Sequence, residues 1–244
     1  MDPVLLAVAA FGLFFAGIVK GTTGIGYSSC ALPFLVPVVG LQTSIVLIVM
    51  PAILSNVFVA LNAGHFREIV TRFWPLYLAT PIGILVGVAF LSSVDQRVSI
   101  AALGLVIVAY TVISLVQPSL SLSPPWDRIL NAPVGFFTGL LTGLTGSQVM
   151  PLLPYMMALH LEPNRLIQAI NLAVTITSIF LGAGLMLSGL MDMPTLGLSL
   201  FAVIPALVGV SLGNRVRNLL PVLLFRRLML LVLLAIGIMF ILRG

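Results

Sequence analysis

Apolar residues occur along the chain in ten runs, each 11 to 22 residues long, separated by short breaks that contain glycine, proline or a charged residue. The runs are Val4–Val19, Ile25–Val39, Gln42–Ala63, Phe73–Leu91, Val98–Val116, Ile129–Leu141, Val149–Leu159, Leu166–Leu187, Thr195–Leu212 and Leu223–Leu242. About 20 apolar residues in a helix cross the hydrocarbon core of a bilayer. The pattern predicts an all-α integral membrane protein with about ten transmembrane or half-spanning helices.

The composition supports a membrane environment. Of 244 residues, 60% are hydrophobic and only 7% are charged, and the mean hydropathy is +1.25. A soluble domain carries about 25% charged residues, so we expect no appended soluble enzyme or receptor domain. The net charge of +5 comes from basic residues that are scattered singly between apolar runs. They indicate topology rather than a nucleic-acid partner.

One break is polar enough to be a linker. Residues 118–128 contain Pro118, Pro124 and Pro125, and they separate a first transmembrane repeat over residues 1–117 from a second over residues 129–244. Each half contains five of the apolar runs.

Similar residues recur in the two halves. One match, at an offset of 122, is Phe15-Ala-Gly-Ile-Val-Lys-Gly-Thr-Thr-Gly with Phe137-Thr-Gly-Leu-Leu-Thr-Gly-Leu-Thr-Gly. After a four-residue difference, Ser29-Cys-Ala-Leu-Pro matches Ser147-Gln-Val-Met-Pro. The pair Gly83 and Gly87 likewise corresponds to Gly209 and Gly213. Gly-x-x-x-Gly lets apolar helices approach closely. The recurrence predicts an internal duplication.

An odd number of spans in each half predicts that the second half is inverted in the membrane. Basic residues gather in cytoplasmic connections. With the N-terminus outside, nine of the eleven basic residues fall on the inner side and two, Arg97 and Arg243, on the outer side. The inner residues are Lys20, Arg67, Arg72, Arg128, Arg165, Arg215, Arg217, Arg226 and Arg227. Many secondary transporters consist of inverted repeats, with the substrate near the midplane.

We therefore predict a multi-pass protein of the cell inner (plasma) membrane with both termini outside. Cysteine-accessibility labelling at each end of the chain in intact cells is the test. A C-terminus that is labelled only after the membrane is permeabilised would contradict the inverted arrangement.

The second run of each half is short and contains proline. Short, Gly/Pro-interrupted segments at corresponding positions of two halves are a good indication of a transport site. We expect hydroxyl groups at these breaks to cap the helices that follow; they belong to Thr22, Thr23, Ser28, Thr145 and Ser147. A helix that begins inside the membrane directs free N–H groups and a partial positive charge toward an anion.

The candidate substrate-binding residues are the polar and glycine residues of the two breaks, together with two asparagines within apolar runs. They are Lys20, Gly21, Thr22, Thr23, Gly24, Ser28, Asn56, Gly143, Thr145, Gly146, Ser147, Gln148 and Asn171. Hydrogen bonds to a charged ligand contribute about 1.5–3 kcal/mol each, so we expect the substitutions Thr23→Val and Thr145→Val to weaken binding.

Structural interpretations of these residues stay open. The Gly/Thr clusters also fit tight helix crossings without a ligand. Lys20 also fits an inner connection, where it would obey the topology rule. The amides of Asn56 and Asn171 also fit hydrogen bonds between helices.

The motifs carry a resemblance to a known family. Gly17-Ile-Val-Lys-Gly-Thr-Thr-Gly-Ile-Gly followed by Pro33, its repeat Gly139-Leu-Leu-Thr-Gly-Leu-Thr-Gly with Pro151, and Pro81-Ile-Gly resemble the sulfite exporter TauE/SafE family, over essentially the whole chain. The resemblance implies permeation, mostly outward, of small sulfur-containing anions such as sulfite, sulfonates or sulfur-bearing organic acids. The implied partners are this substrate and the lipid bilayer, with a homodimer left open.

Two other classes of protein would need a different kind of site. A drug/metabolite-type exporter with a 5+5 arrangement would carry larger organic solutes and would need an acidic or aromatic lining, which the sequence does not suggest. An enzyme would need a nucleophile with a base, or a metal cluster. No such motif occurs, and the two histidines and single cysteine are isolated. We expect no enzyme activity, no cofactor and no metal.

The apolar runs also bear on the driving force. The six acidic residues and the two histidines all fall at the ends of runs or between them. Proton relays in membranes usually rely on Asp, Glu or His within the bilayer. The sequence therefore favours a uniporter or an anion exchanger over a proton-coupled pump.

Overall fold

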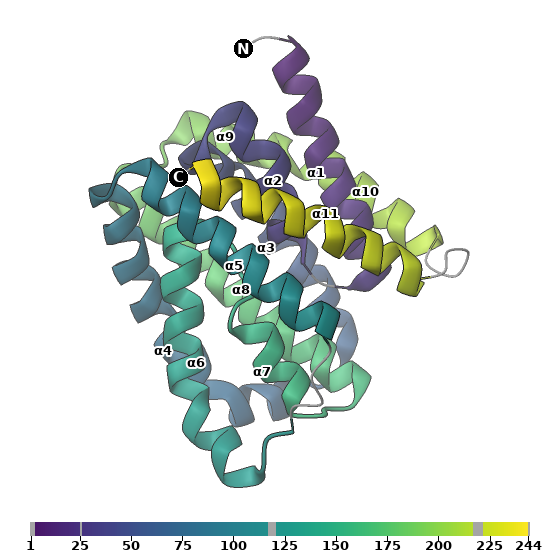
Figure 1. Ribbon diagram of the computed structural model, residues 1–244. Helices are drawn as coiled ribbons and strands as arrows, with labels where there is room; N and C mark the ends of the chain where they lie inside the picture. The colour runs from purple at the N-terminus through teal and green to yellow at the C-terminus, as the bar shows by residue number, and fades with distance from the viewer. Residues whose placement is uncertain (1–2, 25, 117–120, 217–221, 244) are drawn as a thin grey trace.

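The computed structural model describes residues 3–24, 26–116, 121–216 and 222–243, and these residues are almost entirely helical, with no strand among them (Figure 1). The helices are α1 (Pro3–Thr23), α2 (Tyr27–Val39), α3 (Leu41–Ala63), α4 (Phe66–Ser93), α5 (Gln96–Val116), α6 (Pro124–Thr145), α7 (Leu152–Ala158), α8 (Pro163–Leu187), α9 (Met193–Phe201), α10 (Val203–Val216) and α11 (Val222–Arg243). The all-α prediction is confirmed.

Several helices fit a bilayer. Within the described residues, four stretches are long and apolar enough to cross a membrane: α4, α5, α8 and Met193–Arg215, which covers α9 and α10. The described parts of α1, α2, α3 and α11 are shorter apolar helices. These lengths and compositions are those of a multi-pass membrane protein.

The helices differ in detail from two of the predicted segments. The run Thr195–Leu212 is two helices, α9 and α10, separated at Ala202. Pro205 explains this break, because a proline ring clashes with the carbonyl four residues earlier, here that of Phe201. The predicted linker 118–128 is also shorter: α6 begins at Pro124 after the N-cap Ser123, with proline in its first turn. This is a favourable position for proline.

Some residues named in the sequence analysis lie outside the described part of the chain. They are Ile25, residues 117–120 at the start of the linker, and Arg217, together with Asp2, one of the six acidic residues.

The helices of the two sequence halves are interleaved. The most extensive contacts join α4 with α6, α1 with α10, α11 with α5, and α3 with α8. In Figure 1 the yellow α11 runs alongside the teal α5. Each of these pairs takes one helix from each half. Exchanging the halves converts the α1–α10 pair into the α6–α4 pair, which is the pattern that a duplication predicts. The orientation of the halves in a membrane stays a prediction.

Glycines make two of these contacts close. A Cβ atom added to Gly17 would lie 2.3 Å from the carbonyl oxygen of Ala206, and one added to Gly139 would lie 2.1 Å from that of Thr80. The same holds from the opposite side at Gly83, where the nearest atom is the carbonyl oxygen of Phe136 at 2.0 Å. Such distances are far below a van der Waals contact. Glycine is therefore required at these crossings, as in other tightly packed membrane helices.

The crossings generate a stability prediction. The substitution Gly139→Ala should lower the midpoint of thermal unfolding in detergent, because α4 and α6 must separate to admit the methyl group. Overpacking of this kind costs about 1–3 kcal/mol. The matched control is Gly197→Ala on α9, where an added Cβ meets no atom within 4 Å. The control should leave the midpoint unchanged or raise it, and equal losses in both variants would contradict the analysis of the crossing.

Candidate substrate-binding site

The first helix of each half ends in the same way. Gly24 follows α1 with φ 81° and Gly146 follows α6 with φ 74°, both in the left-handed region that favours glycine. The amide of Gly24 donates to the carbonyl of Lys20 at 2.6 Å, and the amide of Gly146 donates to that of Thr142 at 2.7 Å. These glycines terminate the helices as C-cap residues commonly do, so the breaks that the sequence indicated are present.

The two breaks meet. The hydroxyl oxygens of Ser29 and Ser147 lie 2.9 Å apart. The Ser28 hydroxyl donates to Oε1 of Gln148 at 3.2 Å, and Nε2 of Gln148 donates to the Ser178 hydroxyl at 2.8 Å. Ser29 and Ser147 are matched positions of the sequence repeat. Contact between matched residues is expected where they lie on the axis that relates two duplicated halves.

A small cavity of about 20 Å³ lies beside these contacts. In this conformation it has room for about one water molecule. Residues of α1, α2, α3, α7, α8 and the segment before α7 form its walls: Lys20, Gly26, Tyr27, Ser28, Ser29, Asn56, Gln148, Val149, Leu153, Ile170 and Val174. The lining contains one basic residue and no acidic residue.

Lys20 is the charged residue of this cavity, and it is the only lysine of the chain. Its exposed fraction is 2%, and its Nζ donates to Oδ1 of Asn56 at 2.5 Å. The amide nitrogen of Asn56 donates in turn to the carbonyl of Ala52 at 2.6 Å, which fixes the amide with its oxygen toward Lys20. No carboxylate pairs with Lys20 within the described residues.

The interpretation of Lys20 as a residue of an inner connection was therefore wrong. The helix α1 continues to Thr23, so Lys20 lies on a helix and inside the bundle. An ammonium group has three donors, and Asn56 takes one. Because a buried charge is costly unless it is paired, an anion in the cavity would stabilise this side chain.

Two further kinds of donor are present at the cavity. The side chain of Tyr27 is 3% exposed, and its hydroxyl has no hydrogen-bond partner among the described residues. Tyr27 also begins α2, whose N-cap Gly26 provides no side-chain cap. Cys30 donates back to Gly26, while the N–H groups before it have no partner within the helix. These groups can donate to an anion.

The expected side-chain caps are absent from both breaks. The hydroxyls of Thr22 and Thr23 donate to the carbonyl of Val19 at 2.9 and 2.8 Å, and the Thr145 hydroxyl donates to that of Leu141 at 2.6 Å. Threonine within a helix often bonds to the preceding turn in this way. In this arrangement the three hydroxyls offer lone pairs but no proton, whereas an anion requires donors.

The cavity brings together four of the candidate residues: Lys20, Ser28, Asn56 and Gln148. Ser147 is not part of the described lining, and its amide donates to the Thr145 hydroxyl at 3.2 Å.

Other candidates lie elsewhere. Gly21 and Gly143 pack at helix crossings, where an added Cβ would lie 2.3 Å from the carbonyl oxygen of Val210 and 2.6 Å from that of Ile84. Asn171 is buried on α8 and donates to the carbonyl of Ile167 at 2.9 Å. Its oxygen has no partner among the described residues. Their role in binding stays a prediction.

The sequence analysis missed several lining residues. Ser29 could have been found, because it is the repeat partner of the candidate Ser147. Tyr27 had no such signal, since the absence of a partner for its hydroxyl depends on tertiary packing. Ile170 and Val174 are ordinary apolar residues of α8, and only the fold turns them toward the cavity.

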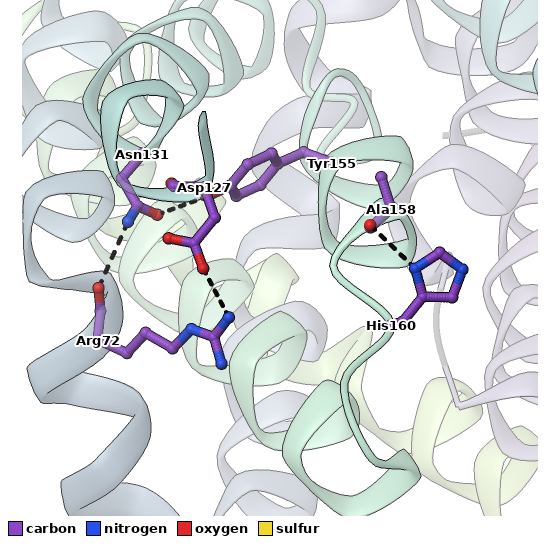
Figure 2. Close-up of polar contacts among 6 residues, drawn as sticks. All are labelled: Arg72, Asp127, Asn131, Tyr155, Ala158 and His160. Atoms are coloured by element: carbon purple, nitrogen blue, oxygen red, sulfur yellow. Dashed lines mark hydrogen bonds and ion pairs between the residues drawn. The ribbon is translucent and has the colours of Figure 1, made fainter. Parts of the chain in front are cut away.

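A polar cluster holds α7, which carries the lining residue Leu153, against α4 and α6 (Figure 2). The Tyr155 hydroxyl lies 2.6 Å from the carbonyl oxygen of Asp127 and 2.9 Å from Oδ1 of Asn131. Arg72 pairs with the Asp127 carboxylate at 2.7 Å. His160, at the other end of the view, contacts the carbonyl of Ala158 at 3.1 Å. Within the described residues no three His, Cys, Asp or Glu side chains group as metal ligands would.

Apolar helices of membrane-spanning length, packed around a buried cavity with a basic residue, are features of a multi-pass membrane protein. The chain belongs to the sulfite exporter TauE/SafE family, whose model matches residues 9–240. Neither the curated proteins nor the solved structures give a match to this chain. The family implies a membrane exporter of sulfite or related sulfur anions, which is consistent with a protein that is not an enzyme.

The contact between the breaks can be tested by cross-linking. In a Cys30→Ser background, the pair Ser29→Cys and Ser147→Cys should form a disulfide under mild oxidation, because the two hydroxyl oxygens lie 2.9 Å apart and a disulfide needs Cβ atoms about 3.5–4.5 Å apart. Loss of maleimide-reactive thiols, restored by reduction, is the readout.

The control pair is Ser29→Cys with Ser188→Cys. Ser188 lies fourteen residues beyond the lining residue Val174 along α8, a distance of about 21 Å at about 1.5 Å per residue. This pair should keep both thiols. Equal cross-linking of both pairs would contradict the contact.

Proposed function

We propose that the protein exports small sulfur-containing anions such as sulfite, sulfonates or sulfur-bearing organic acids, and that the anion binds near the midplane in the cavity between the two Gly/Thr-rich helix breaks. The observation that carries the proposal is Lys20, which is buried in the cavity, bonded to a neutral amide and without a carboxylate partner in the described structure.

The donors of the cavity suit an oxyanion. Sulfite and sulfonate groups present oxygens that only accept hydrogen bonds. The Nζ of Lys20 and the hydroxyl of Tyr27 can donate to them, and so can the N–H groups at the start of α2. That helix has 13 residues, and its N-terminus adds a partial positive charge. Helix N-termini are common anion-binding positions for this reason.

The interleaved halves suit alternating access. Inverted-repeat transporters move one part against the other around a central site. Exchange of the helix pairs α1–α10 and α6–α4, and the contact between Ser29 and Ser147, support two related halves with the site at their junction. The distribution of the other basic residues, eight on the predicted inner side and two on the outer side, supports the inverted orientation.

The lining argues against the alternative of a drug/metabolite-type 5+5 exporter. Such a site would hold larger, often cationic or neutral solutes, and would need acidic side chains or a larger volume. The described lining contains one basic residue and no Asp or Glu, and the cavity is small, at about 20 Å³. These features favour a small anion.

The membrane potential is sufficient to drive export. A monovalent anion that leaves a cell with a negative interior gains about 2.3 kcal/mol per 100 mV. We retain a uniporter or an anion exchanger as the proposal. Lys20 nevertheless adds an ionisable group inside the bundle, which the argument from the acidic residues and histidines did not include.

The charge of Lys20 provides the test. Purified protein should bind sulfite and methanesulfonate, measured by calorimetry, and Lys20→Met should weaken both by about ten- to a hundredfold, because a hydrogen bond to a charged group contributes about 1.5–3 kcal/mol. Lys20→Arg keeps the charge in a larger group and should retain part of the affinity.

The matched control is Arg67→Gln, which removes one positive charge from an exposed position of α4. Its affinity for both anions should equal that of the wild type. Unchanged binding in a folded Lys20→Met variant would place the anion elsewhere.

A further inference from the structure

A second cavity, of about 60 Å³, adjoins the cavity of Lys20. It lies among α1, α2, α5, α7 and α11, and its lining is Val19, Thr23, Gly26, Ser29, Cys30, Tyr110, Ser114, Leu153, Met157, Met229, Leu230 and Leu233. Gly26, Ser29 and Leu153 belong to both linings. The two cavities are therefore neighbours that share one wall.

Two of the three residues between the cavities have small side chains or none. Gly26 has no side chain, and a Cβ atom added there would meet no described atom within 4 Å. Ser29, which also separates the two cavities, has only a hydroxymethyl group. A bound molecule could therefore extend from one cavity into the other beside α2.

The two cavities differ in chemistry. The first contains Lys20 with the amides of Asn56 and Gln148. The described lining of the second contains no charged residue; six of its twelve residues are aliphatic or thioether, such as Met157, Leu230 and Leu233, and four carry a hydroxyl group. A polar cavity beside an apolar one matches a ligand with a charged end and an apolar end.

We propose that the substrate is amphipathic: its sulfur oxyanion binds at Lys20, and an apolar organic substituent passes Gly26 and fills the second cavity. This inference rests on the proposed function and narrows its substrate class from sulfur anions in general to organosulfur anions with an aliphatic or aromatic substituent. An inorganic anion such as sulfite uses only the first cavity.

The apolar walls explain why such a substituent would strengthen binding. An inorganic ion gains nothing from an aliphatic surface, whereas each buried CH₂ group of a substituent leaves water. The corresponding transfer free energy predicts a gain in affinity of about three- to fourfold for each CH₂, as long as the second cavity has room.

The experiment measures the affinity of purified wild-type protein for methane-, propane- and hexanesulfonate and for sulfite. Affinity should rise about three- to fourfold per CH₂, and sulfite should bind like methanesulfonate. Hexyl methyl sulfone, which has the same hydrocarbon chain without the charge, should bind at least tenfold more weakly than hexanesulfonate. In Lys20→Met all anions should weaken by a similar factor, which distinguishes binding in the site from partition into detergent.

The single cysteine supplies a second readout without any substitution. Cys30 lines the second cavity and not the first. Hexanesulfonate should slow its reaction with N-ethylmaleimide, while saturating methanesulfonate should not. The variant Leu233→Trp, which fills the second cavity, should keep the affinity for methanesulfonate and lose the gain with chain length.

The outcomes separate the two proposals. Equal affinity for methane- and hexanesulfonate, or equal protection of Cys30 by both, would overturn the amphipathic substrate and leave the anion site intact. Tight binding of the uncharged sulfone would also overturn it, because the charged end would then be unnecessary. Failure of every anion to bind the wild type would overturn the proposed function itself.

Discussion

Backbone contact at glycine is the constraint on which the rest of the structure depends. Hydrocarbon chains solvate apolar side chains as well as other helices do, so membrane helices associate through close packing rather than through a hydrophobic force. Gly21 touches α10 on one face of α1. Consecutive helical residues are about 100° apart, at about 3.6 residues per turn, so Lys20 points to the side of this crossing, and there it meets Asn56 of α3. The crossing thus fixes the direction of the charge.

The same scaffold occurs in the second half without the charge. Thr142 is the repeat partner of Lys20, and its hydroxyl donates within the protein, to the carbonyls of Thr138 or Ser147. Gln148, which lines the polar cavity, matches Cys30, which lines the apolar one. Equivalent positions of the two halves thus line different cavities. This difference explains how a nearly symmetric arrangement of helices can surround an asymmetric site.

The sequence predicted the helices well because hydropathy and glycine spacing are properties of local segments. The match of Ser29 with Ser147 made the two residues equivalent positions of a repeat, but their contact is known only from the fold. Prediction from sequence failed where a few residues decide an outcome. Pro205 divides one apolar run, and three further helical residues after Lys20 move that side chain from a connection into the bundle. The Tyr27 hydroxyl has no hydrogen-bond partner among the described residues. This could not be predicted from sequence, because it depends on the packing of the other helices.

A buried lysine without a carboxylate also bears on how the proposed cycle would run. A ligand shifts a conformational equilibrium only by its difference in affinity for the two states. When the cavity is closed and empty, the Lys20 ammonium would lose its contact with water and gain no opposite charge, which disfavours that state. An anion in the cavity supplies the missing charge and so stabilises the closed state selectively. The loaded protein would then pass between its two open states more readily than the empty one. Of the two proposed mechanisms that do not use protons, this asymmetry favours exchange of one anion for another over uniport.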